Sequence, residues 1–397
     1  MPLRSFAALL LSSGLALIGF AFEIHPLPSP AAAGALGSSF AVATDGAIYL
    51  AWVEPSGADR SALHVARYDA AENRWGDTHR VAEGGGWLVN PLNFPKIAAH
   101  PGGKLAATWA VLPPGATNPH DGANTFYAES SDDGRTWSEP RPLSRESHAV
   151  FFATLLPLPD GRTLALWIDG RNMRTNGHRQ GLFANFLGAD AADTELDRSI
   201  CDCCEIRLAL TPRGATAVYR GRSDAEIRDI LAVTLADGSW TAPTRLHADE
   251  WKINGCPMNG PQIAARDATA VAAWFTSADD APRALATVSR DGAKTFGEAL
   301  RIDLGRAQGR VDTAVLADGT AVVTWLETKT TTTPGGIYLR TISSAGEMSD
   351  PRLLVPAEKA SAIAGFPRVA VLGSGQVLLT YTRGGNAGGI ESALVSL

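Results

Sequence analysis

Four cysteines lie in two short stretches of the chain. Cys201, Cys203 and Cys204 share one tetrapeptide, and Cys256 follows further along, directly before Pro257. An even number of cysteines in a secreted chain indicates disulfides. Because only Cys256 is distant from the other three, at most one bridge spans a long stretch of chain. A bridge between the adjacent Cys203 and Cys204 would be strained.

A metal site is the alternative to two disulfides. Thiolate and thioether sulfurs favour Cu(I) or Zn(II), and a histidine can complete such a ligand set. The candidate metal ligands are Cys201, Cys203, Cys204, Cys256, Met258 and His148. The spacing of the cysteines leaves both the bridged form and the metal-bound form open.

Arginines and carboxylates gather in runs such as IDGR, YRGRSDAEIRD and GRVD, which we expect at the ends of strands. A guanidinium can bind a carboxylate through two parallel hydrogen bonds, so these arginines suit an anionic ligand. A solvated polar rim is the alternative interpretation. The candidate catalytic residues are Arg171, Arg220, Arg310, Arg368, Asp229, Asp312 and Glu327, and the candidate ligand-binding residues are His148, Asp169, Arg228, Asn254 and Asn259.

Seven short apolar segments, each closed by a Trp or Tyr, are the elements that must position these residues. The aromatic residues are Trp52, Trp109, Trp167, Tyr219, Trp274, Trp325 and Tyr381, and they recur roughly every 50 to 60 residues. Tight turns upstream, such as Asp45-Gly46 and Asp318-Gly319, predict that each segment is the second strand of a hairpin. Weaker third and fourth strands follow in most repeats. The pattern predicts an all-β fold, a β-propeller of four-stranded antiparallel blades, with seven blades favoured over six.

The last repeat contains only three predicted strands, so the ring needs a fourth strand from elsewhere. The segment from Glu23 to Leu27 is one source; a blade shared by the first and last repeats, which gives six blades, is the other. In a propeller the loops that lead into the innermost strands and those that leave the second strands lie on one face. This geometry would bring the scattered arginines, carboxylates and cysteines together around one axis.

Two turns have a more specific pattern. Residues 130–137 read S-S-D-D-G-R-T-W, and residues 289–296 read S-R-D-G-A-K-T-F. An Asp side chain caps the turn amides, and Gly permits a left-handed backbone. These residues resemble the Asp-box, the bacterial neuraminidase repeat of the sialidase superfamily. The resemblance implies a β-propeller in which these turns are scaffold on the face away from the ligand.

The resemblance to sialidases also implies a chemistry. Sialidases hold a substrate carboxylate with three arginines, use a Tyr activated by a Glu as nucleophile, and use an Asp as acid/base. Arg310, Arg368 and either Arg171 or Arg220 would form the arginine triad. The family's R-I-P motif is missing, and its nearest equivalents are Phe94-Pro95-Lys96 and Phe366-Pro367-Arg368. Tyr219 is the one tyrosine that we expect near this face. The stretches Cys256-Pro257 and Asn259-Gly260-Pro261 are similar to those of a sialidase-like subset with a cysteine cluster.

The N-terminal segment and the composition restrict the cellular setting. Residues 1–21 read as a signal peptide, 22–34 as a Pro- and Ala-rich linker, and 35–397 as a single propeller domain; an uncleaved membrane anchor is the alternative for the first segment. We therefore expect a secreted or periplasmic monomer with no membrane span after signal removal. A net charge of −6 argues against nucleic acid as a partner.

Two functions remain open from the sequence. The first is a sialidase-like protein with an axial site for an acidic glycan or similar anionic ligand, acting as an exo-sialidase if it is an enzyme. The second is a non-catalytic propeller that binds Cu, Zn or a partner through its cysteine cluster.

Overall fold

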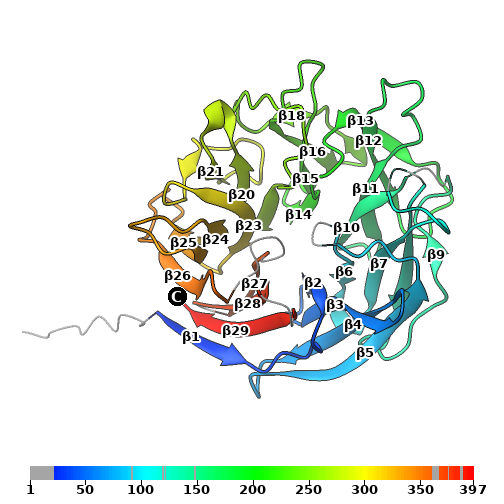
Figure 1. Cartoon of the computed structure of the whole chain (residues 1–397), viewed down its shortest axis with the longest axis horizontal. Coiled ribbons are helices and arrows are strands. Elements are labelled where there is room, and N and C mark those ends of the chain that lie inside the picture. Colours follow the sequence, from blue (N-terminus) through cyan, green and yellow to red (C-terminus); the bar gives the residue numbers. More distant parts are fainter. Residues whose placement is uncertain are drawn as a thin grey trace, which may run out of the picture.

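A computed structural model describes residues 22–90, 93–118, 120, 122–146, 149–359, 366–373, 375–384 and 388–397. The expected signal peptide and His148 lie outside the described residues. The sheets follow one another round a ring in chain order (Figure 1). Seven antiparallel sheets form this ring, which confirms the predicted β-propeller. Within the described residues, no helix is long and apolar enough to cross a membrane.

The first three blades each contain four consecutive strands. Blade 1 comprises β2 (Leu36–Val42), β3 (Ile48–Gly57), β4 (Arg60–Asp69) and β5 (Arg74–Gly85). Blade 2 comprises β6 (Lys96–Ala99), β7 (Leu105–Val111), β8 (Asn124–Ser130) and β9 (Arg141–Pro142), with the 3-10 turn η1 (Pro101–Gly103) between β6 and β7. Blade 3 comprises β10 (Phe151–Pro157), β11 (Thr163–Asp169), β12 (Gln180–Phe186) and β13 (Thr194–Ile200).

The next three blades continue in the same order. Blade 4 comprises β14 (Arg207–Thr211), β15 (Gly214–Arg220), β16 (Ile230–Ala236) and two short outer strands, β17 (Ser239–Trp240) and β18 (Thr244–Arg245). Blade 5 comprises β19 (Gln262–Arg266), β20 (Thr269–Thr276), β21 (Arg283–Ser289) and β22 (Leu300–Arg301), with the 3-10 turn η3 (Ala278–Asp280) after β20. Blade 6 comprises β23 (Ala307–Val315), β24 (Ala321–Glu327), β25 (Gly336–Ile342) and β26 (Arg352–Pro356).

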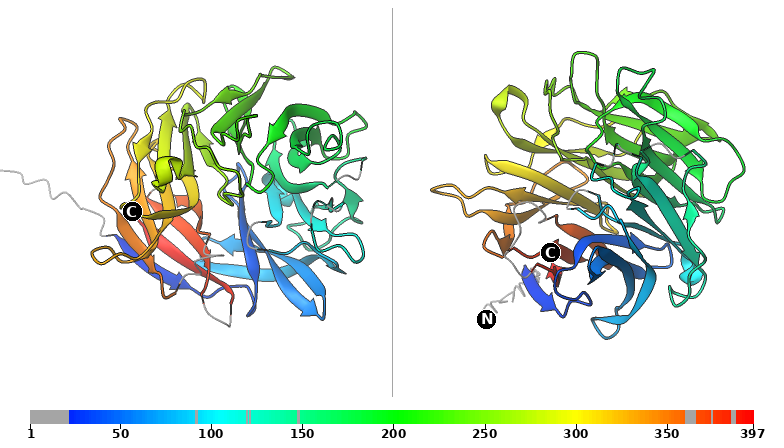
Figure 2. Two further views of the ribbon diagram at one scale, coloured as in Figure 1. Left: turned by 45° about the horizontal axis from the view of Figure 1, so that its top comes forward. Right: turned by 45° about the vertical axis from the view of Figure 1, so that its right-hand side comes forward.

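The last blade joins the two ends of the described chain. It contains β27 (Arg368–Gly373), β28 (Gln376–Thr382) and β29 (Ile390–Ser396), and its outer strand is β1 (Glu23–Leu27), which pairs antiparallel with β29. The tilted views of Figure 2 show β1 (blue) along the outer side of this blade (red). The N-terminal segment thus supplies the fourth strand, and the six-blade alternative is wrong.

The repeated aromatic residues fill the spaces between blades. Trp52, Trp167, Trp274 and Trp325 are fully buried. Strands β11 and β24 are buried along their whole length, on both faces, as expected for strands sandwiched between neighbouring sheets. One apolar cluster, for example, joins Val271 and Phe275 of blade 5 to Val323 and Trp325 of blade 6.

The two S-x-D turns have the same hydrogen bonding. In the first, Ser130 Oγ accepts from the Gly134 N–H (3.0 Å) and Asp132 Oδ1 accepts from the Thr136 N–H (2.9 Å). In the second, Ser289 and Asp291 make the equivalent bonds at 2.9 Å each. Both turns follow the third strand of a blade and none of these bonds reaches the axis, so they stabilise the blade locally.

Candidate functional site at the propeller axis

A carboxylate, Glu205, is shared by three side chains at the start of innermost strands. Its Oε1 is ion-paired with Lys96 Nζ, at the start of β6. Its Oε2 accepts from Arg368 Nη2 of β27 (2.9 Å) and from Gln262 Nε2 of β19 (3.1 Å). Glu205 itself precedes β14, so four blades meet at one side chain. Burial opposes ionisation, but Arg368 and Lys96 outweigh it and hold the pKa of Glu205 well below its usual range.

Gly260 allows this convergence. A Cβ at Gly260 would lie 2.3 Å from the Glu205 carbonyl oxygen, so only glycine lets the two loops pass this closely. The Asn-Gly-Pro stretch seen in the sequence therefore has a packing role. It holds the loop that begins at Cys256 against the loop that carries Glu205.

Positive charge exceeds negative charge around Glu205. The cations are Lys96, Arg207, Arg310 and Arg368, and the anions are Glu205 and Asp312. Asp312 is buried and its carboxylate accepts from the Val369 N–H (2.8 Å); burial raises its pKa. Arg207 and Arg310 have no carboxylate within ion-pair distance in the described part of the chain. Burial without such a partner lowers the pKa of Arg310 to about 10.

Two phenylalanines form the apolar part of the site. Phe94 and Phe366 come from the Phe-Pro-Lys and Phe-Pro-Arg stretches, and their ring centroids lie 4.9 Å apart, edge to face. Arg310 lies over Phe366 at 4.5 Å, and Arg368 lies 5.3 Å from Phe94 and 5.7 Å from Phe366. The two F-P-[KR] stretches are therefore brought together by the ring, although blades 2 to 6 lie between them in sequence.

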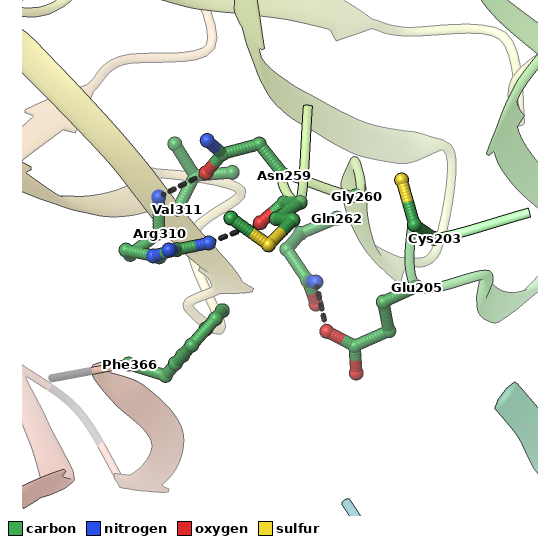
Figure 3. Close-up of a pocket in the computed structure, with 9 residues that line it drawn as sticks. Cys203, Glu205, Asn259, Gly260, Gln262, Arg310, Val311 and Phe366 are labelled. Carbon is green, nitrogen blue, oxygen red and sulfur yellow. Dashed lines mark hydrogen bonds between the residues drawn. The ribbon is translucent and has the colours of Figure 1, made fainter. Parts of the chain in front are cut away.

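Three buried polar atoms at this site have no hydrogen-bond partner among the described residues: Gln262 Oε1, Arg310 Nε and Arg368 Nη1. Two of the three residues, Gln262 and Arg310, line the same small cavity, together with Glu205, Asn259 and Phe366 (Figure 3). The cavity volume of about 10 Å³ suits one water or one ligand oxygen. Buried polar atoms are normally paired, so these three atoms are available to a water molecule or to a polar atom of a ligand.

The other predicted arginines are already engaged. Arg220 is buried, and its guanidinium donates to the carbonyls of Arg228, Asn259 and Phe275 at 2.6–3.3 Å. Arg171 is ion-paired with Asp169 (2.6 Å) and Asp193 (2.8 Å). Of the expected triad, the structure brings only Arg310 and Arg368 together, because Arg171 is held by two carboxylates and Arg220 by three backbone carbonyls.

Two predicted carboxylates serve the scaffold. Asp169 Oδ2 accepts from Trp167 Nε1 (2.9 Å), and Glu327 Oε2 accepts from Trp325 Nε1 (2.7 Å). Glu54 does the same for Trp52 (2.6 Å). Residues two apart on a strand lie on one face, so a carboxylate in this position can receive the indole N–H. The spacing Trp-x-acid is visible in the sequence and indicates that the acid binds the indole of the preceding Trp, whereas Asp169 and Glu327 were predicted as site residues.

Two predicted ligand-binding residues, Asn254 and Asn259, and the predicted catalytic residue Asp229 lie in different places. Asn259 Oδ1 accepts from the Arg310 N–H (2.9 Å), so it positions Arg310, whereas Asn254 is exposed. Asp229 lines a cleft of about 500 Å³ on the outer part of blades 3 and 4, where Arg245 donates to it (3.2 Å). Burial raises the pKa of Asp229.

Two of the four cysteines form a disulfide and two are free thiols. Cys203 and Cys256 form a disulfide, whereas Cys201 and Cys204 are free and buried. Arg228 Nη1 donates to Cys201 Sγ (3.3 Å). Burial opposes ionisation of Cys204, yet the hydrogen bond with Cys201 and the charge of Arg220 bring the pKa of Cys204 to about 6. The interpretation with two disulfides is therefore wrong for Cys201 and Cys204. Met258, the predicted thioether ligand, is exposed and lines the axial cavity.

Tyrosine is absent from the described part of the axial site. Tyr219 donates to Asp197 Oδ2 (2.8 Å), and burial raises its pKa. The hydroxyls of Tyr49, Tyr68 and Tyr338 bond to Asp133, Asn73 and the Pro334 carbonyl. The Tyr–Glu nucleophile expected from the sialidase resemblance is therefore not among these contacts.

Comparison with known proteins shows the fold alone. No protein-family model matches the chain, and no curated protein sequence is significantly similar to it. Among solved structures, the polysaccharide lyase Uly1 is similar with a TM-score of 0.54, 12% identity, and coverage of 91% of this chain and 90% of that one. A PL25 ulvan lyase bound to -[GlcA(1-4)Rha3S]- also reaches 0.54, with 13% identity and coverage of 94% and 95%.

Two further solved structures also match the fold of this chain. A protein of unknown function from Dyadobacter fermentans has a TM-score of 0.51 and 13% identity, with coverage of 95% of this chain and 98% of that one. The microbial sialidase Hz136 reaches 0.48 with 14% identity, over 74% of this chain and 63% of its own; that similarity is too low to support an argument. The chain is thus a seven-bladed propeller with polysaccharide-active proteins among its structural neighbours.

Proposed function

We propose that this protein binds an acidic saccharide at the propeller axis, with the sugar carboxylate held by Arg310. The observation that carries this proposal is the half-buried guanidinium of Arg310, which has no carboxylate within ion-pair distance in the described part of the chain. Its Nη1 donates to the Met258 carbonyl, whereas its Nε has no hydrogen-bond partner among the described residues, as is also true of Gln262 Oε1 and Arg368 Nη1. An arginine that lacks an acidic partner can donate to a ligand carboxylate at little cost. The neighbouring Phe366 ring provides an apolar surface for the body of the sugar.

The geometry supports binding better than glycoside hydrolysis. A sialidase-type reaction needs a nucleophile at the site, and no tyrosine is among the described residues that line the axial cavity. Burial raises the pKa of Asp312, which is the property expected of an acid catalyst. Asp312 is, however, ion-paired with Arg368, with an Oδ1–Nη1 distance of 3.9 Å. Exo-sialidase activity remains the specific hypothesis to test, with release of sialic acid from a fluorogenic substrate as the assay.

Calorimetric titration tests the binding proposal. The probes are N-acetylneuraminic acid, a glucuronate-containing disaccharide and a neutral disaccharide of the same size. Binding of an acidic probe, with none of the neutral one, is the expected result. Arg310→Gln should weaken that binding by about ten- to a hundredfold, because a hydrogen bond to a charged group is lost.

Arg266→Gln is the matched control for this variant. Arg266 is an exposed arginine at the opposite end of β19 from Gln262, so its loss should leave the affinity unchanged. Equal affinity of the wild type and Arg310→Gln for the acidic probe would contradict the proposal.

The proposed setting is outside the cytoplasm. The Cys203–Cys256 disulfide supports this setting, because such bridges persist in oxidising compartments. The signal-peptide reading of residues 1–21 agrees with it. Mass spectrometry of the protein recovered from a periplasmic or culture-medium fraction tests the proposal, with a mature N-terminus near Phe22 as the expected result.

A further inference from the structure

Three sulfur atoms lie together beside the axial site. Cys201 Sγ is 3.4 Å from Cys204 Sγ and 3.7 Å from Cys203 Sγ. In the described part of the chain, these three residues form the one group of three or more Cys, His, Asp or Glu side chains whose ligand atoms all lie within 4.8 Å of one another. Cys203 is bonded to Cys256, so two thiols, Cys201 and Cys204, remain free to act as ligands.

We propose that Cys201 and Cys204 bind one cuprous ion, Cu(I). Thiolates select soft cations, among which Cu(I) accepts two or three sulfur ligands. A structural zinc site needs four ligands, and the disulfide removes two of the four sulfurs from that role. With metal–sulfur distances of about 2.3 Å, one ion can reach two sulfurs as much as roughly 4.6 Å apart. The observed 3.4 Å lies within this reach, and rotation of the two side chains can widen it towards the linear arrangement that two-coordinate Cu(I) prefers.

The surroundings of the two thiols compensate the charge of such a site. Both side chains are buried, with exposed fractions of 1% for Cys201 and 2% for Cys204. Two thiolates and one Cu(I) carry a net charge of −1. Arg228 donates to Cys201 Sγ (3.3 Å), and the positive charge of Arg220 acts on Cys204. A buried negative charge needs partners of this kind.

These two arginines are themselves held in place. Arg228 is ion-paired with Glu226 (2.6 Å), and Arg220 is fixed by three backbone carbonyls. Fixed donors around metal-bound sulfur orient the ligands and tune affinity. The role of Arg220 and Arg228 is thus to support the thiol pair, and the proposed copper site does not depend on the saccharide proposal.

Anaerobic titration with Cu(I), in competition with the chromophoric chelator bicinchoninate, tests the site. The protein is the disulfide-intact chain, with no added thiol or phosphine. One equivalent of Cu(I) should bind, and Cys204→Ser should weaken binding by at least about a hundredfold, because one of two thiolates is lost. The matched control is the Cys203→Ser/Cys256→Ser double variant, which removes the disulfide, keeps the pair and should retain one equivalent.

Two measurements on the wild-type chain keep the test independent of variant folding. Thiol titration in denaturant should count two thiols, and X-ray absorption at the copper edge should show two or three sulfur neighbours. A count of zero thiols, which would mean a second disulfide between Cys201 and Cys204, overturns the proposal. A Cu(I) affinity that is the same in wild type and Cys204→Ser also overturns it.

Discussion

Glu205 is the residue on which the axial site depends. It neutralises Lys96 and Arg368, which are both almost fully buried, and it leaves Arg207 and Arg310 without a carboxylate partner in the described part of the chain. A cluster of this kind contributes more to the position of its members than to net stability, because burying charges is itself costly. Its energetic importance emerges when one partner is removed.

Glu205→Gln should therefore destabilise the protein strongly. The change leaves two buried cations without their carboxylate, at a cost of about 3–5 kcal/mol in the free energy of unfolding. Urea denaturation followed by tryptophan fluorescence measures the change. The control is Glu298→Gln at an exposed position, which should stay within about 0.5 kcal/mol of wild type. A variant as stable as wild type would show that the Glu205 ion pairs are not formed.

Glu205 should also make the stability of the protein depend on pH. The pKa of Glu205 is lower in the folded protein than its ordinary value near 4.5, so the folded state favours the charged form. Its contribution to stability is present above pH 4.5 and is lost as the pH falls below that value. Unfolding midpoints measured from pH 7 downwards should fall more steeply below pH 4.5 for wild type than for Glu205→Gln. Parallel pH curves would contradict this assignment.

Sequence reasoning missed Glu205 for a physical reason. Its partners lie on β6, β19 and β27, and a loop conformation decides which of several acids reaches them. Arg310 and Arg368 were predicted, because their place at the start of innermost strands follows from the repeat alone. The free and bridged cysteines were not separable from sequence, since all four belong to neighbouring loops.

At the scale of elements, the second strands depend on their Trp–carboxylate pairs. Glu327 accepts from Trp325 Nε1 and also from the Leu304 (3.1 Å) and Arg306 (2.6 Å) backbone N–H groups. It therefore fixes the loop between β22 and β23 to the end of β24. A carboxylate at a strand end resembles a catalytic acid in sequence, and the indole two residues before it distinguishes the two roles.

Glu327→Ala should lower the free energy of unfolding by about 1–3 kcal/mol, because one buried and two half-buried N–H donors lose their acceptor. Thermal denaturation measures this loss, and titration with the acidic saccharide should show an unchanged affinity. Unchanged stability together with lost saccharide binding would contradict the structural role of Glu327 and would show that it belongs to the ligand site. Ser344→Ala, on the exposed turn between β25 and β26, provides a control for handling and folding.

At the scale of the whole molecule, the ring is closed by pairing the first described strand with the last. Five residue pairs, from Glu23 with Ser396 to Leu27 with Ser392, connect β1 to β29. The repeat of aromatic residues was enough to predict the number of blades, because each blade must bury the same faces. The short β1 has no aromatic signal, so only the shortage of strands in the last repeat indicated its role.

A chain that begins at Ser29 should be less stable than one that begins at Phe22. Without β1, the edge of β29 exposes its backbone hydrogen-bonding groups and can pair with other molecules. We expect a melting temperature lower by roughly 5 °C or more, with oligomers in size-exclusion chromatography. His25→Ala, which changes an exposed side chain of β1 and keeps the strand, should behave as the intact chain. Equal melting temperatures for both lengths would contradict the role of β1.

The pairing of β1 with β29 also determines when the ring can close. During synthesis the ribosome releases β1 long before β29, so every nascent chain of intermediate length lacks one partner of the closing pair. Blades can form one after another, but the native circle is completed only after translation has reached the end of β29. Closure is thus timed by the length of the polypeptide itself, and a prematurely terminated product remains an open arc.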